Sequence, residues 1–160
     1  MSSGNQPKLS QFDAIVLAGG ESRRMGAPKA NLPFGDTSLI GAAVATYKLV
    51  FRQVFVVTRD KTSLLDLGVE IAEDEHPLQG PLVGEVRGLD RQRCRVAACD
   101  MPYLSAALIQ DMSANLGDCD ALIPEINDRL QTLHAFYNKS CRPSRRSCSA
   151  WVIPPCTPWP

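Results

Sequence analysis

The 160-residue sequence lacks several features that are typical of membrane, secreted and nucleic-acid-binding proteins. No apolar run approaches the roughly 18 residues that a membrane-spanning helix requires. The opening residues, MSSGNQPKLSQ, contain no apolar core of a signal peptide. Neither charge is in excess, because 17 Lys and Arg residues balance 17 Asp and Glu residues. We therefore expect a cytoplasmic protein with neither nucleic acid nor a membrane as partner, in which any charge-based function is local.

The cysteines do not form a recognisable metal site. The sequence has 6 Cys residues but no CxxC pair, and only 2 His residues are present to complete a zinc site. Reduced thiols, three of them buried in strands, are the better interpretation. Internal repeats are also absent, and no low-complexity linker precedes residue 140, so the length fits a single domain.

Short apolar runs alternate with helical patterns, which predicts an α/β fold with a mostly parallel sheet. Strands are expected over 12–18, 53–58, 69–74, 93–100, 119–124 and 130–137, and helices over 37–51, 61–67, 81–90 and 104–115. Thr37 is the expected N-cap of the first helix. The expected buried face of that helix carries Leu39, Ile40, Ala43, Val44 and Tyr47. Ser105 and Pro102 set off the last helix.

The two ends of the chain differ in amino-acid composition from the rest. Residues 1–11 are expected to be a flexible N-terminus, 12–140 the domain, and 141–160 an irregular or disordered tail. That last segment packs five prolines, three cysteines and three arginines into CRPSRRSCSAWVIPPCTPWP. Prolines so dense exclude a helix interior or a central strand. Three cations make only a weak basic patch.

The most informative stretch is IVLAGGESRRMGAPKANLPFG, in which two glycines directly follow the first expected strand. Gly19 and Gly20 permit close approach of a ligand to the backbone and leave amide groups free to face it. Arg23, Arg24 and Lys29 then supply charge suited to phosphate oxygens. The stretch is neither a P-loop nor a GxGxxG fingerprint, which disfavours a Walker-type ATPase and a NAD-linked oxidoreductase. The pattern therefore predicts a nucleotide site beyond the carboxyl ends of the strands.

Two aspartates are expected at the same edge of the sheet. Asp100 ends an apolar strand and precedes Met-Pro, and a carboxylate there suits Mg²⁺ bound together with substrate phosphates. The alternative is that Asp100 caps the next helix. Asp74 could accept a hydrogen bond from a base or ribose, or it could be a solvated loop acid within EDEH.

Four segments, in this order, carry a resemblance to a known family: LAGGESRRMGAPKANLPFG, EDEHPLQGPLVG, ACDMPYL and LQTLHAFY. With them, residues 12 to about 140 resemble the molybdenum cofactor guanylyltransferase family. This family belongs to a larger group of nucleotidyltransferases with a three-layer, nucleotide-diphospho-sugar transferase-like fold. Its cytidylyl and sugar-nucleotide relatives more often show LAAG or LAGGxGTRL, so LAGG followed by SRRMG favours the guanylyl branch.

The resemblance implies Mg²⁺-dependent transfer of GMP from GTP to molybdopterin, which gives molybdopterin guanine dinucleotide and pyrophosphate. Molybdoenzyme maturation proteins are further possible partners. The implied contacts are Leu17, Ala18 and Gly19 with the guanine nucleotide, Lys29 with the phosphates, Asp74 with the nucleoside, and Asp100 with nucleotide and metal. Gly20 and Arg24 belong to the same loop, and the expected catalytic set is Arg24, Lys29 and Asp100. We expect His134 and the cysteines to be core or surface residues.

The sequence departs from the family at two places. VGEVRG introduces Glu85 and Arg87 where a small or apolar pair is usual. After YNKSC the family continues with an amphipathic helix, a strand and a closing helix, none of which is visible, so the C-terminal elements are expected to be truncated. Two alternatives stay open: transfer from another nucleotide to molybdopterin or a sugar phosphate, and a GTP-binding protein without turnover.

Overall fold

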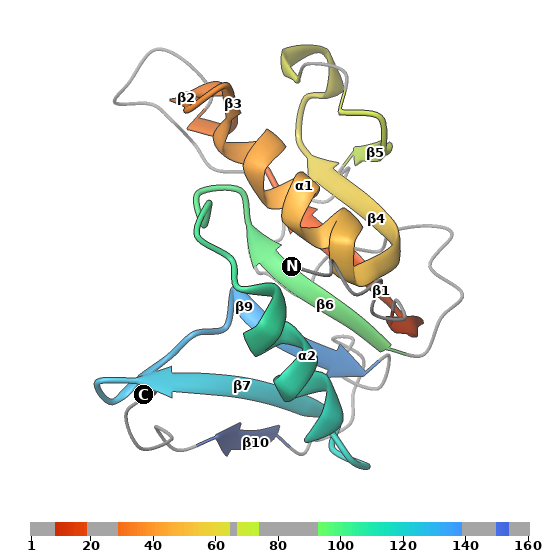
Figure 1. The fold of residues 1–160 in the computed structure, drawn as a ribbon, viewed down its shortest axis with the longest axis vertical. Coiled ribbons are helices and arrows are strands. Elements are labelled where there is room, and N and C mark those ends of the chain that lie inside the picture. The colour runs from red at the N-terminus through yellow and green to blue at the C-terminus, as the bar shows by residue number, and fades with distance from the viewer. Residues whose placement is uncertain (1–8, 19–28, 65–66, 74–92, 139–149, 154–160) are drawn as a thin grey trace, which may run out of the picture.

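The computed structural model describes residues 9–18, 29–64, 67–73, 93–138 and 150–153. Its centre is one sheet with the strand order β10-β7-β9-β6-β1-β4-β5, in which β8 pairs with β7 off this path (Figure 1). A second, two-stranded sheet consists of β2 and β3. The strands of the main sheet are β1 (Leu9–Leu17), β4 (Phe51–Thr58), β5 (Glu70–Glu73), β6 (Arg93–Ala98), β7 (Ala121–Ile126), β8 (Arg129–Leu130), β9 (His134–Asn138) and β10 (Ala150–Ile153). The small sheet and the helices are β2 (Pro33–Phe34), β3 (Thr37–Ser38), α1 (Leu39–Val50), α2 (Ala106–Ala114) and the 3-10 turns η1 (Lys29–Asn31) and η2 (Lys61–Ser63).

The main sheet is mostly parallel. Strand β1 pairs in parallel with β4 and β6, and β4 pairs in parallel with β5. Only β9 runs against its neighbours on the main path, between β6 and β7, and β10 is parallel to β7. The predicted α/β class with a mostly parallel sheet is therefore confirmed.

Strand β1 lies in the middle of the sheet because its apolar run can be buried on both faces. Residues 12–16 are all buried, as is typical of a parallel strand covered on both sides. Their side chains alternate between two clusters: Ala14 and Val16 join the larger one, and Ile15 joins the smaller one with Val57 and Val96. The core is thus divided by the sheet itself.

Helix α1 forms where apolar residues recur at helical spacing. Ile40, Ala43, Val44 and Tyr47 are buried as predicted, and Val50 continues the same face. The predicted N-cap was wrong by one residue. Ser38 Oγ accepts a hydrogen bond from Gly41 N at 3.2 Å, whereas Thr37 lies in β3.

Both described helices pack on the same face of the sheet. Ile109 and Met112 of α2 join the larger cluster with the buried residues of α1. The start of α2 is as expected, because Ser105 is its N-cap and its Oγ accepts a hydrogen bond from Leu108 N at 3.2 Å. The helix expected over 81–90 lies outside the described residues. No helix of the described part combines the length and the apolar character needed to cross a membrane.

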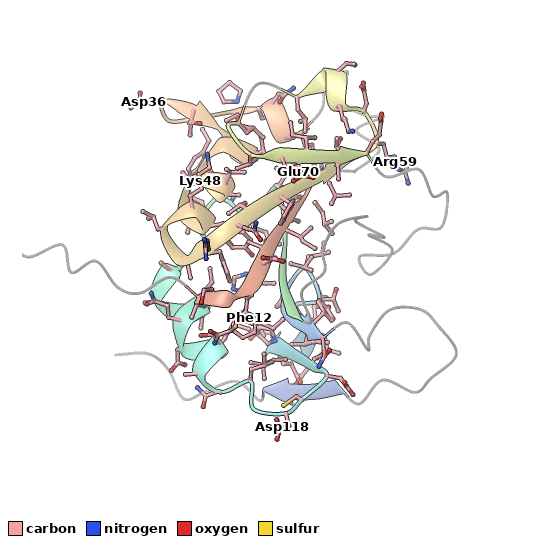
Figure 2. The ribbon with its side chains drawn as sticks, turned by 90° about the vertical axis from the view of Figure 1, so that its right-hand side faces the viewer. Phe12, Asp36, Lys48, Arg59, Glu70 and Asp118 are labelled. Atoms are coloured by element: carbon pink, nitrogen blue, oxygen red, sulfur yellow. The ribbon has the colours of Figure 1, made fainter. Side chains whose placement is uncertain are left out.

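Aromatic rings join the two halves of the chain within the larger cluster. Phe136 of β9 lies 5.1 Å from Phe12 and 6.4 Å from Phe51, measured between ring centroids. Tyr47 of α1 contacts Phe51 at 5.2 Å. Figure 2 shows Phe12 inside the molecule, while Asp118 lies at the end opposite Asp36. These contacts tie β9, which comes late in the sequence, to β1, β4 and α1.

Two expected elements differ in extent. The strand expected over 130–137 is replaced by two strands, β8 and β9. Asn127 and Asp128 adopt positive φ values of 51° and 59° and turn the chain back, so that β8 pairs with β7 as a hairpin. A second turn, in which His134 N donates to Gln131 O at 2.8 Å, precedes β9. The helix expected over 61–67 is described only as the turn η2.

The two chain ends carry strands that the sequence did not predict. Strand β1 begins at Leu9, inside the segment expected to be flexible, and Leu9 pairs with Phe51. Strand β10 lies within the proline-rich segment and pairs with β7 at the edge of the sheet. The sequence Pro154-Pro155 follows it directly, and proline is tolerated beside edge strands but not in central ones.

Candidate functional site

The carboxyl ends of the three central strands meet at one edge of the sheet. Leu17, the last residue of β1, pairs with Val57 of β4 and with Ala98 of β6. Just beyond, Ala18 N donates to Val57 O at 2.7 Å, and Cys99 N donates to Leu17 O at 2.9 Å. The segments that follow β1, β4 and β6 therefore start side by side, as the parallel topology predicts.

Of the four expected backbone contacts with a nucleotide, Leu17 and Ala18 are described. Both are half-buried and lie where β1 leaves the sheet. Gly19, Gly20 and Arg24 lie outside the described residues, as does Asp74, which follows β5 in the sequence. The roles expected for these four residues remain predictions.

Lys29 is positioned by a short turn that is anchored in the core. It opens η1, in which Ala30 is only 2% exposed while Lys29 itself is exposed. Leu32 N donates to Lys29 O at 3.1 Å and closes the turn. The buried alanine fixes the backbone, so that the neighbouring ammonium group stays on the surface.

Asp100 is positioned by the turn that ends β6. Met101 N donates to Ala98 O at 3.3 Å, which places Cys99 and Asp100 at the corner of that turn. Asp100 is exposed, and Cys99 is buried. Asp100 does not cap α2, because Ser105 occupies that position. The alternative interpretation of Asp100 as a helix cap is therefore wrong.

The thiol of Cys99 is influenced by the charges of both Lys29 and Asp100. The pKa of Cys99 is raised from its ordinary value of 9.0 to about 11, mainly by burial and then by the negative charge of Asp100. A backbone hydrogen bond and the positive charge of Lys29 act in the opposite direction. One buried group thus feels both a cation that follows β1 and a carboxylate that follows β6.

The carboxylate of Asp100 suits a metal ion that takes its other ligands from the substrate and water. Among the described residues no group of three or more His, Cys, Asp or Glu side chains could hold a metal ion. A single exposed carboxylate with a lysine nearby does not make an all-protein cage. It does suit Mg²⁺, which is commonly held by one or two carboxylates together with substrate phosphates.

The structure adds an aromatic pair that sequence reasoning missed. Tyr103, three residues after Asp100, contacts Phe34 of β2 with ring centroids 5.3 Å apart and planes at 82°. Phe34 and Tyr103 lie within two of the four family-like segments described above, but nothing in those segments indicates that the two rings would meet. His134 reaches the same edge, because it pairs with Ala97 of β6. Its expected non-catalytic role stays a prediction.

Comparisons with known proteins agree with this architecture. Residues 14–150 match the family model described as the MobA-like NTP transferase domain. A probable molybdenum cofactor guanylyltransferase of Pelotomaculum thermopropionicum is 34% identical over 136 residues, which cover 83% of this chain and 66% of that protein. A protein of the same description from Mycobacterium tuberculosis is 40% identical over 123 residues, which cover 72% and 61% of the two chains.

A solved structure shows the same fold. The molybdopterin-guanine dinucleotide biosynthesis protein A of Archaeoglobus fulgidus superposes with a TM-score of 0.69 at 25% identity, over 89% of this chain and 83% of that one. The chain spans only 66% and 61% of the lengths of the Pelotomaculum and Mycobacterium relatives.

Proposed function

The chain belongs to the family of MobA-like NTP transferases, and from that premise we propose that it transfers GMP from GTP to molybdopterin. The products are molybdopterin guanine dinucleotide and pyrophosphate. Relatives described as probable molybdenum cofactor guanylyltransferases support this choice of substrates. The observation that carries the proposal is the convergence of the carboxyl ends of β1, β4 and β6 at one edge of the sheet, which Asp100 follows directly after β6.

In the proposed reaction, a terminal phosphate oxygen of molybdopterin attacks the α-phosphorus of GTP. The new P–O bond forms as the bond between the α-phosphorus and its bridging oxygen breaks, and pyrophosphate leaves with the electron pair. A phosphate nucleophile needs no general base at neutral pH. The reaction therefore depends on positioning and on neutralising charge.

Each residue of the site has a part in that task. Lys29 contacts the phosphates, and Arg24 of the same loop adds a second positive charge. The backbone of residues 17–20 admits the nucleotide closely, and Asp74 contacts the nucleoside. Asp100 would hold Mg²⁺, and the bound metal would supply positive charge that offsets the negative charge on the phosphate oxygens.

Nucleotide-dependent thermal stability tests the binding half of the proposal. With Mg²⁺ present, GTP should raise Tm more than CTP, ATP or UTP, because a ligand that binds only the folded state stabilises it. At a hundredfold excess over Kd the gain is about 2.7 kcal/mol. Lys29→Ala and Asp100→Asn should abolish most of the shift. A stronger response to CTP or UTP would instead support transfer of another nucleotide.

Matched surface substitutions control for a general loss of charge. Arg52 is exposed near the start of β4, at the opposite edge of the sheet. Asp118 is exposed in the turn between α2 and β7, which Figure 2 places at the far end of the molecule. Arg52→Ala and Asp118→Asn should keep the full GTP shift. Equal losses in all four variants would contradict the assigned site.

Pyrophosphate release tests turnover. Release that requires both GTP and molybdopterin supports the transferase, whereas a GTP-dependent Tm shift without release identifies a nucleotide-binding protein.

A further inference from the structure

The contact between Phe34 and Tyr103 is an exposed aromatic pair at the edge of the proposed active site. Tyr103 is 87% exposed, the largest value among the exposed large apolar side chains of the described residues. Phe34 is half-buried. Their interplanar angle of 82° is an edge-to-face arrangement, a favourable geometry for two aromatic rings. A ring so exposed presents most of its surface to solvent.

The pair joins two segments that leave the sheet from neighbouring strands. Phe34 belongs to the β2–β3 sheet, whose turn passes through Gly35 at a φ of 57°. Tyr103 follows β6 and comes directly after Pro102, which fixes its own φ and so restricts the turn. Figure 1 shows the β2–β3 sheet and the turn after β6 on the same side of the molecule, beyond the arrowhead of β6.

We propose that Tyr103, oriented by Phe34, stacks against the flat fused-ring heterocycle of the acceptor. The inference rests on the proposed function, because molybdopterin carries a pterin ring system at one end and the attacking phosphate at the other. Stacking on an aromatic side chain is a common way to hold a planar heterocycle, since it replaces water on two apolar faces at once.

The strand order favours the acceptor over the guanine base as the stacked ring. The proposed nucleoside contact, Asp74, follows β5 in the sequence, and β5 lies beyond β4 on one side of β1. Tyr103 follows β6, on the other side of β1. The phosphates lie between them, near Lys29 and Asp100.

The spacing along the chain agrees with this placement. Tyr103 comes three residues after Asp100, so their Cα atoms are separated by at most about 11 Å, given the reach of an extended chain. An acceptor ring held by Tyr103 therefore remains close enough to Asp100 for the attached phosphate to reach the reaction centre.

The competing explanation is that the aromatic pair only pins the β2–β3 sheet to the turn after β6. The two explanations differ in what a substitution changes. Replacing a purely structural contact changes the stability of the protein, whereas replacing a stacking surface changes the binding of a planar ligand. With its high exposure, Tyr103 can be replaced without leaving a cavity in the core.

Direct titration with a fluorescent pterin that carries a phosphomonoester tests the proposal without requiring turnover. Tyr103→Ala should weaken binding about 10-fold, which corresponds to about 1.4 kcal/mol. Tyr103→Phe keeps the ring and should bind within twofold of the parent. Phe34→Leu, which removes the orienting ring, should give an intermediate loss. Leu49→Ala, which truncates another exposed apolar side chain near the end of α1, should bind as the parent does.

Several results would overturn the stacking role: no binding of the pterin phosphate to the parent protein, equal binding by parent and Tyr103→Ala, or an equal loss in Leu49→Ala. A matching loss of the GTP-dependent Tm shift in Tyr103→Ala would also overturn it, because the ring would then contact the nucleotide. Failure of the proposed function is distinguishable. In that case the parent shows no Tm shift with GTP, while the titration with pterin phosphate still reports on Tyr103.

Discussion

The thiol of Cys99 offers a test of the site geometry that needs no substrate. It is buried and lies next to Asp100 in the chain, and its pKa is raised to about 11, mainly by burial and then by Asp100. A thiol with the ordinary pKa of 9.0 is about one-tenth ionised at pH 8. A shift of two units lowers the thiolate fraction of Cys99 about 100-fold. We expect its alkylation at pH 8 to be slower by at least that factor.

Replacing the two flanking charges should move the reactivity of Cys99 in opposite directions. Asp100→Asn removes a charge that raises the pKa, so alkylation should become faster. Lys29→Ala removes a charge that lowers it, so alkylation should become slower. Arg52→Ala and Asp118→Asn, at the far edge of the sheet, should leave the rate unchanged.

The assay is alkylation by iodoacetamide in metal-free buffer between pH 7 and 11, followed by mass spectrometry of peptides. Cys119, which is half-buried, serves as an internal reference within the same molecule. The labelling rate of Cys99 should keep rising up to about pH 11. Equal labelling of Cys99 and Cys119 at pH 8, or shifts of the same sign in the Lys29 and Asp100 variants, would refute the arrangement. Because the unfolded thiol ionises first, the folded state should also lose stability as pH rises from about 9 to 11.

Two further predictions concern the scaffold that holds the site. Ser38→Ala removes the N-cap of α1 and should lower the free energy of unfolding by about 1 kcal/mol in urea denaturation. Thr37→Ala, one residue earlier, should have a smaller effect; the reverse order would show that the cap is misassigned. Phe136→Ala deletes a fully buried ring that contacts Phe12 and Phe51, and should cost about 3–5 kcal/mol. A loss below about 1 kcal/mol would show that β9 does not pack against β1 and β4.

The sequence predicted the parallel part of the sheet well because its buried residues follow one another directly in the chain. The runs 14–17 within β1 and 54–57 within β4 are continuous and apolar, as is typical of strands covered on both faces. Helix α1 was likewise visible from the spacing of Ile40, Ala43, Val44 and Tyr47. In these elements the pattern of side chains alone specifies the structure.

Boundaries were less predictable because they depend on turn geometry. Thr37 and Ser38 are both residue types that occur at N-caps, and only the point at which α1 begins after β3 decides which of them is the cap. Asn127 and Asp128 tolerate positive φ, but their sequence does not show that the chain reverses there. Strand β10 forms close to prolines because residues 150–153, which precede Pro154, pair with β7.

For the candidate site, residue types and strand ends were enough to predict Lys29 and Asp100 as site residues, because parallel strands bring their carboxyl ends to one edge. The sequence by itself determined the fold class and the kind of chemistry that this edge can support. Only the tertiary structure decided that the buried Cys99 is influenced by both of those charges and that Phe34 meets Tyr103. Such contacts depend on how separate turns pack in space, and no periodicity along the chain records them.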